Sequence, residues 1–168
     1  HGAEVFFLII GRNLIVIRRN NPIFYDTESL KNTEIFLRLD RTAEADVVKG
    51  WVPAYYFTIC LLDGTEVGTC DFRVGYNENT YYGGNIGYAV KEAYRGSHYA
   101  GKACLLLFAL ARKHDMKELI ITCSPDNMAS RKTCEYAGGK LKEIARLPEG
   151  CEMYLNGDRE KCIYVFHV

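Results

Sequence analysis

Apolar and polar residues alternate along the first half of the chain with the period of two that is typical of half-buried β-strands. Such alternation runs through residues 35–40. The stretches 54–62 and 65–74 are also rich in apolar residues, and they flank Asp63-Gly64, a dipeptide that favours a tight hairpin turn. A further apolar run spans residues 86–90. The pattern therefore predicts a series of antiparallel strands.

The second half of the chain predicts helices alternating with strands. Between residues 103 and 111 apolar side chains recur at helical spacing and form one face that covers the sheet. This face is expected to contain Ala103, Cys104, Leu107, Leu110 and Ala111. The run 119–123 predicts a strand parallel to 86–90, reached by a right-handed crossover. A second helix is predicted over 128–137, ended by Gly138-Gly139 through a positive φ.

The remaining segments complete a single domain. Residues 140–147 and 161–167 predict a closing pair of strands joined by a long loop. Residues 42–49 have room for at most two helical turns before Gly50 and Pro53 interrupt them. We therefore predict an α/β fold with a mixed, mostly antiparallel twisted sheet and two main helices.

The N-terminal segment is more apolar than the rest of the chain. Residues 5–10 and 14–17 are apolar but too short, even together, to cross a bilayer. We interpret them as a pair of strands, or as one strand and a short arm, packed on the body or on a partner chain. Residues 1–3 are interpreted as an expression remnant.

Charge and cysteine content narrow the function. The chain of 168 residues has 21 basic and 21 acidic residues, a balance that argues against a nucleic-acid partner. Seven cysteines are present without a C-x-x-C pair, as expected of reduced thiols in a cytoplasmic protein. The four histidines do not cluster with cysteines, so no metal site is expected.

The stretch 90–103 connects a predicted strand to a predicted helix and is rich in small residues. A helix N-terminus carries unpaired N–H groups and partial positive charge, so this loop predicts an anion site, with Arg95 and Lys102 at its rim. Gly96 to Ala103 also reads G-x-x-x-x-G-K-A, close to a nucleotide-binding P-loop. Ala103 has no hydroxyl to hold magnesium, and this argues against that alternative.

A second interpretation includes more of the chain. The loop residues Arg95, His98 and Ala100, followed by Asn127 and Ser130, resemble the two signatures of the GNAT superfamily of acyl-CoA-dependent N-acyltransferases, in its small bacterial branch. In that family's loop a glycine is usual where His98 stands. By this resemblance, residues 1–34 form an N-terminal arm and residues 35–168 the acetyltransferase domain.

The resemblance implies an acetyl-CoA site. Its phosphates would be held by the loop residues Arg95, Gly96, Ser97, His98, Tyr99, Ala100, Gly101 and Lys102. The thioester carbonyl would meet the backbone near Ala89 and Val90, and Asn127 and Ser130 would contact the pantetheine arm. Asn127 is also a good helix N-cap. His98 either contacts phosphate or only fills the glycine position.

The usual acid and base of the family are missing. Many members have Glu where this chain has Asn85, and Tyr where it has Cys134. Candidate replacements are Tyr88, Asp71 and Tyr82. Asp71 is either a base or one partner of a surface ion pair. Cys134 is either a proton donor or transient acyl carrier, or a packed helix cysteine.

The sequence therefore predicts direct transfer of acetyl from acetyl-CoA to a primary amine in a ternary complex. A peptide N-terminus, a polyamine, an amino sugar and a drug all stay open as acceptors. The alternative is a non-catalytic acyl-CoA-binding module. No membrane or nucleic-acid partner is expected. By the resemblance, helices that shape the acceptor pocket are usual where residues 42–49 stand, and this segment is too short for them. This short segment, the apolar N-terminal arm and the dimers common in the family predict a homodimer.

Overall fold

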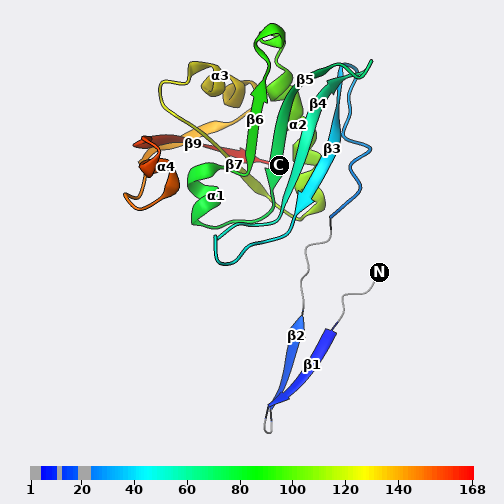
Figure 1. The fold of residues 1–168 in the computed structure, drawn as a ribbon, viewed down its shortest axis with the longest axis vertical. Coiled ribbons are helices and arrows are strands. Elements are labelled where there is room, and N and C mark those ends of the chain that lie inside the picture. The colour runs from blue at the N-terminus through cyan, green and yellow to red at the C-terminus, as the bar shows by residue number, and fades with distance from the viewer. Residues whose placement is uncertain (1–4, 11–12, 19–23) are drawn as a thin grey trace.

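The computed structural model describes residues 5–10, 13–18 and 24–168 (Figure 1). Its helices are α1 (Glu78–Gly83), α2 (Tyr99–Lys113), α3 (Met128–Tyr136) and α4 (Glu152–Leu155), with a 3-10 turn η1 (Glu92–Tyr94). Its strands are β1 (Val5–Ile10), β2 (Asn13–Arg18), β3 (Ile35–Ala43), β4 (Ala54–Leu61), β5 (Glu66–Arg73), β6 (Ile86–Val90), β7 (Glu118–Cys123), β8 (Lys140–Arg146) and β9 (Glu160–His167).

The body contains two antiparallel sheets. Strands β3-β4-β5-β6 form one sheet and β7-β9-β8 form the other. The predicted β6–β7 pairing is confined to one end, where the backbone N–H of Asn85 donates to the Ile120 carbonyl and the Asn85 side chain accepts from the Ile120 N–H. Among the described strands no ladder continues this contact, so the two sheets part beyond Asn85.

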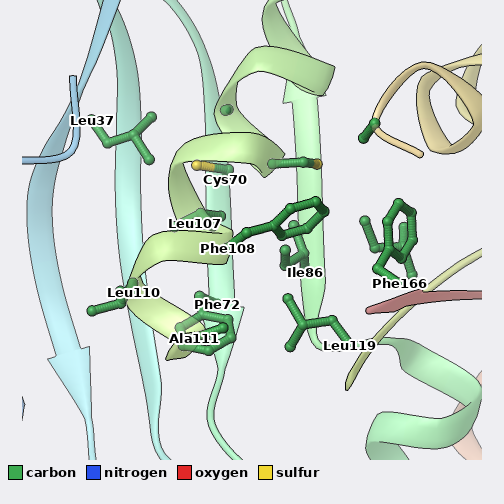
Figure 2. Close-up of a cluster of buried hydrophobic side chains, with 14 of the residues drawn as sticks. Leu37, Cys70, Phe72, Ile86, Leu107, Phe108, Leu110, Ala111, Leu119 and Phe166 are labelled. Carbon is green, nitrogen blue, oxygen red and sulfur yellow. The ribbon is translucent and has the colours of Figure 1, made fainter. Parts of the chain in front are cut away.

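Helix α2 lies across one face of the four-stranded sheet (Figure 1). The five residues predicted for its buried face are all inaccessible to solvent, so this prediction is confirmed. Figure 2 shows Leu107 and Leu110 on the helix, among the strand residues of the core. Phe108 packs on Phe166 of β9, with ring centroids 5.3 Å apart, and so connects the helix to the second sheet. The parted sheets therefore share one core.

The connections differ from the prediction in three places. Residues 42–49 are not helical: β3 continues to Ala43, and Asp46 and Trp51 exchange backbone hydrogen bonds around a four-residue turn. Helix α1 lies between β5 and β6, where no helix was predicted, and its start is stabilised by Asn77 and Thr80, which form a reciprocal capping box. The four-residue helix α4 lies within the predicted long loop.

The N-terminal region divides into two parts. Strands β1 and β2 form an antiparallel pair, so the predicted strand pairing is confirmed, while its packing on the body or on a partner chain stays a prediction. Residues 1–3 lie outside the described residues. Leu30 is only 3% exposed and belongs to the core, so the segment from residue 24 packs on the body, while the domain division at residue 34 stays a prediction. Among the described helices, none is long and apolar enough to cross a membrane.

Candidate active site

The loop between β6 and α2 is built around two residues with positive φ. Gly96 has φ 93° and His98 has φ 59°, and His98 is the N-cap of α2. The first intrahelical hydrogen bond runs from the Lys102 N–H to the His98 carbonyl. The N–H groups of residues 99–101 are therefore free of helical partners and point out of the helix start, as an anion site requires.

Helix α3 begins opposite this loop. The Asn127 side chain accepts a hydrogen bond from the Ser130 N–H at 3.1 Å, which confirms its role as an N-cap. Between the two helix starts is a cavity of about 470 Å³, here named the α2–α3 pocket. It is lined by Tyr88, Ala89, Val90, Tyr94, Arg95, Gly96, His98, Tyr99, Ala100, Asn127, Ala129, Ser130, Lys132 and Thr133.

Strand β6 turns free hydrogen-bond donors toward the gap between the sheets. Lys91 donates its N–H to the Val67 carbonyl on the β5 side, and the Asn85 carbonyl accepts from Arg73 on the same side. Main-chain groups of successive residues in an antiparallel strand point in opposite directions. The N–H groups of Tyr88 and Val90 therefore point away from β5, into the gap.

Most of the predicted cofactor residues line the α2–α3 pocket, and three do not. Ser97 is exposed outside the lining. Gly101 faces the Tyr136 ring, which a Cβ at this position would overlap. Lys102 does not stand at the rim, because its ammonium pairs with Glu34 at 2.6 Å. Tyr94 and Thr133 line the pocket without having been predicted, since neither belongs to a signature.

His98 fills the glycine position in a left-handed conformation. Its ring stacks on the Tyr136 ring, with centroids 4.3 Å apart and planes 5° from parallel. It also lines the pocket, and its contact with phosphate stays a prediction.

Tyr88 brings the predicted acid candidates together. Its hydroxyl lies 2.6 Å from the Ser130 Oγ and 3.9 Å from the Cys134 Sγ. Burial raises the pKa of the Tyr88 hydroxyl well above its ordinary value, so the group stays protonated at neutral pH. Cys134 is inaccessible to solvent, and its hydrogen bond to Cys123 and its burial raise the pKa of its thiol. Cys134 thus packs behind Tyr88 and Ser130 rather than lining the pocket.

Asp71 lies on the opposite face of the sheet from α2. Its carboxylate accepts a hydrogen bond from the Gly87 N–H at 3.2 Å and pairs with Arg73 at 3.1 Å. The predicted ion pair is present, but the Asp71 side chain is only 21% exposed. Burial raises the pKa of this carboxyl, and Arg73 and the Gly87 N–H oppose that rise only in part. A Cβ at Gly87 would lie 2.9 Å from the carboxylate, so only glycine fits there without displacing it.

A second cavity, of about 580 Å³, lies beside Asp71 and was not predicted from the sequence. Here named the α1–α4 pocket, it is lined by Ala43, Glu44, Lys49, Gly50, Trp51, Val52, Ala54, Tyr56, Arg73, Asn79, Thr80, Gly83, Cys151, Glu152 and Met153. Tyr56 and Arg73 flank Asp71, the first as its partner across β4 and β5 and the second as its ion pair. The only signal in the sequence is the single tryptophan, Trp51, which is 55% exposed.

Asn85 stands at the position where the resemblance led us to expect a glutamate base. It is fully buried, and its amide donates to the carbonyls of Arg73 and Gly75 while its oxygen accepts from Ile120. All of its polar atoms are engaged in holding β5 and β7 together. Asn85 is therefore a structural residue here, without access to either pocket.

Tyr82, the third candidate for the missing acid or base, connects to the second sheet through its backbone. Its carbonyl accepts a hydrogen bond from the Thr122 hydroxyl, and its ring packs edge-on against Tyr81. It lines neither pocket.

Comparisons with known proteins agree with this architecture. The family model described as an acetyltransferase (GNAT) domain matches residues 21–140. Among solved structures, a GNAT-family acetyltransferase from Bacillus anthracis is 22% identical with a TM-score of 0.54, over 67% of this chain and 65% of that one. No curated protein matches the chain.

Two further solved structures are similar. The microcin C7 self-immunity acetyltransferase MccE, in complex with acetyl-CoA and AMP, is 21% identical with a TM-score of 0.54, over 68% of this chain and 61% of that one. RimL, a ribosomal L7/L12 alpha-N-protein acetyltransferase in complex with coenzyme A, is 24% identical with a TM-score of 0.54. The match covers 68% of this chain and 62% of RimL.

This chain therefore spans somewhat less than two thirds of the length of these three relatives. At these identities the likeness establishes the fold, and the predicted fold class is confirmed. The family model covers more than half of the 168 residues, and the parted sheets with a glycine-containing loop between β6 and α2 agree with it. The chain belongs to the GNAT acetyltransferase family.

Proposed function

We propose that this protein is an N-acetyltransferase that transfers acetyl from acetyl-CoA directly to a primary amine. The observation that carries the proposal is the α2–α3 pocket, where the free N–H groups at the start of α2 meet the start of α3 and the open edge of β6. MccE and RimL, similar in fold, were solved with acetyl-CoA and coenzyme A respectively.

Each part of the α2–α3 pocket suits one part of the cofactor. The N–H groups of residues 99–101 would bind the pyrophosphate, with Arg95 beside them. Arg95 already donates through Nε to the Val90 carbonyl, which leaves its terminal nitrogens for an anion. The N–H groups of Tyr88 and Val90 would polarise the thioester carbonyl, since fixed backbone donors stabilise a developing oxyanion.

Asp71 is the base that this geometry favours. An alkyl amine with a pKa near 10.4 is only about 0.04% neutral at pH 7, so its deprotonation must be assisted. The Asp71 carboxylate is bound to the β6 backbone at Gly87 and is flanked by two side chains that line the α1–α4 pocket. An acceptor in that pocket would approach β6 from the face opposite α2, and its proton would pass to Asp71.

Tyr88 is the matching proton donor on the other side of β6. Its hydroxyl lies beside Cys134. Cys134 is the α3 residue that stands where many family members have tyrosine, so the Tyr88 hydroxyl reaches the same place from strand β6. It would donate to the coenzyme A sulfur as the thioester breaks. Cys134, buried behind it, would have a packing role only.

The α1–α4 pocket favours a cationic acceptor. Its carboxylates Glu44 and Glu152 form no ion pair with described residues, whereas Arg73 is bound to Asp71 and Lys49 to Asp46. The name of RimL points to a protein N-terminus as acceptor in that relative. A peptide amine or a small cationic amine is therefore the class to screen.

The decisive test is calorimetric titration with acetyl-CoA, coenzyme A and Mg-ATP. We expect both coenzyme A forms to bind, and Gly96→Glu to weaken binding by at least about 100-fold through charge repulsion and steric filling. Gly64→Glu is the matched control, since Gly64 has a similar φ of 91° in the remote β4–β5 turn and the same open surroundings. Equal losses in both variants would mean that the effect is general backbone strain.

Thiol release with a panel of primary amines then separates an enzyme from a binding module. Turnover supports the proposal. Coenzyme A binding without turnover on any amine would favour the non-catalytic alternative, and binding of Mg-ATP alone would restore the P-loop interpretation.

A further inference from the structure

The histidine at the centre of the cofactor loop has a backbone conformation that few residues with a side chain adopt. His98 has φ 59° and ψ 26°, in the left-handed region. Glycine enters this region freely, whereas a Cβ makes it unfavourable. A compensating interaction is therefore needed to hold the loop in the shape that presents the α2 N–H groups.

The structure supplies one such interaction, from a distant part of the chain. The imidazole of His98 lies flat on the ring of Tyr136, at 4.3 Å between centroids and 5° between planes. A second neighbour of the Tyr136 ring is Gly101, in the first turn of α2, where a Cβ would overlap ring carbons. The phenol thus packs simultaneously on the N-cap of α2 and on its first turn.

We infer that Tyr136 is a positioning residue that holds the loop in its cofactor-binding shape through His98. Tyr136 is the last residue of α3, and the start of α3 carries Asn127 and Ser130 on the opposite wall of the pocket. The stack therefore joins the two walls of the α2–α3 pocket before any ligand enters. The inference rests on the proposed acetyl-CoA site, and Tyr136 itself does not line that pocket.

The expected effect is on cofactor affinity and not on chemistry. When the binding-competent loop is only partly populated, the apparent dissociation constant rises in inverse proportion to that population. Loss of a stacked aromatic pair changes an equilibrium constant roughly twofold to tenfold. Tyr136→Ala should raise the Kd and KM for acetyl-CoA by this factor and leave kcat at saturating acetyl-CoA unchanged. Tyr136→Phe, which keeps the ring, should behave as wild type.

The test is a double-mutant cycle with His98→Gly, read by calorimetry and steady-state kinetics. Glycine accepts the positive φ without a stack, so in His98→Gly the shape of the loop no longer depends on Tyr136. In that background Tyr136→Ala should change the Kd by less than about twofold, because the stack through which we infer that Tyr136 acts is gone and only its contact with Gly101 is lost. Tyr154→Ala, which removes an aromatic side chain from α4, is the control for a change outside the pocket.

The outcomes separate this inference from the proposed function. If wild-type protein binds no acetyl-CoA, the proposed site fails and the inference fails with it. If wild-type protein binds, but Tyr136→Ala weakens binding equally with His98 and with glycine at position 98, the site stands and the positioning role is overturned. A matching fall in kcat for Tyr136→Ala and Tyr136→Phe would also overturn it, since the ring would not be the part that matters.

Discussion

The two pockets of this protein are built in different ways. The α2–α3 pocket comes from two short continuous stretches at helix starts and offers mainly backbone N–H groups. The α1–α4 pocket comes from five separate parts of the chain and offers mainly side chains, among them Trp51 and Glu152. Backbone N–H groups are present whatever the side chain, so they suit a ligand such as coenzyme A whose phosphates do not vary. Side chains can be replaced by single substitutions, so they suit a ligand that differs from one protein to the next. The second pocket is therefore where acceptor specificity can change while the fold stays constant.

Strand β6 separates the two pockets and serves both. Tyr88 reaches toward α3 and the α2–α3 pocket, while Gly87, one residue earlier, faces Asp71 beside the α1–α4 pocket. Alternation of side chains along the strand accounts for this division. The comparison predicts that changes on the two faces of β6 have separable effects.

The largest effect is expected for Asp71→Asn. Removing a general base costs about 100-fold or more in kcat, while the Kd for acetyl-CoA should stay unchanged because Asp71 is outside the α2–α3 pocket. A thiol-release assay measures kcat, and calorimetry measures the Kd for acetyl-CoA. Asp40→Asn is the control, since Asp40 also pairs with an arginine, Arg38 at 3.4 Å, but on β3 away from β6. An unchanged kcat in Asp71→Asn would mean that water or another group removes the proton.

Tyr88→Phe should have a smaller effect, of about tenfold in kcat, because a thiolate leaves readily even without a strong donor. The ring and its packing are retained, and only the hydroxyl next to Ser130 is lost. Tyr82→Phe is the matched control, because Tyr82 lines neither pocket. Equal rates for both variants and wild type would remove Tyr88 from the mechanism and leave the cofactor face of β6 with a binding role only.

The same contrast between the pockets explains which parts of the molecule the sequence predicts. The α2–α3 pocket is local, because its loop and the α3 N-cap are continuous stretches of the chain. Their residue types indicate the local backbone conformation, as a glycine does for a turn and an asparagine for a helix N-cap. The helix face at 103–111 was predictable for the same reason, since its spacing is a property of one segment. The α1–α4 pocket depends on how five segments meet, and the single tryptophan, Trp51, is too weak a signal to predict it.

Two residues show why inspection of single positions is insufficient. Asn85 resembles a substituted catalytic base, but its hydrogen bonds reveal a link between sheets that only the fold brings together. His98 resembles a defect in the loop signature, and its partner Tyr136 is 38 positions later in the chain. In both cases the missing information is a tertiary contact.

The smallest expected effect concerns stability, and it tests the burial that makes Asp71 a base. Burial raises the pKa of Asp71 in the folded state above its unfolded value near 3.9, so its contribution to stability is complete below about pH 3.9 and is lost as pH rises through the folded pKa. The Tm of Asp71→Asn minus that of wild type should therefore become more positive from pH 4 to pH 7. Scanning fluorimetry can detect this, because about 1 kcal/mol moves Tm by about 2–4 °C in a protein of this size.

Asp63→Asn provides a control of opposite sign, since hydrogen bonds from Thr65 lower the pKa of the Asp63 carboxyl. Its stabilising contribution is present above the unfolded pKa and is lost only as pH falls through the lowered folded pKa, so the corresponding Tm difference should already be negative at pH 4 and stay nearly constant up to pH 7. If the Tm difference changed with pH in the same way for both variants, burial would not raise the pKa of Asp71. The proposed division of β6 between a base, Asp71, on one face and a proton donor, Tyr88, on the other would then lose its support.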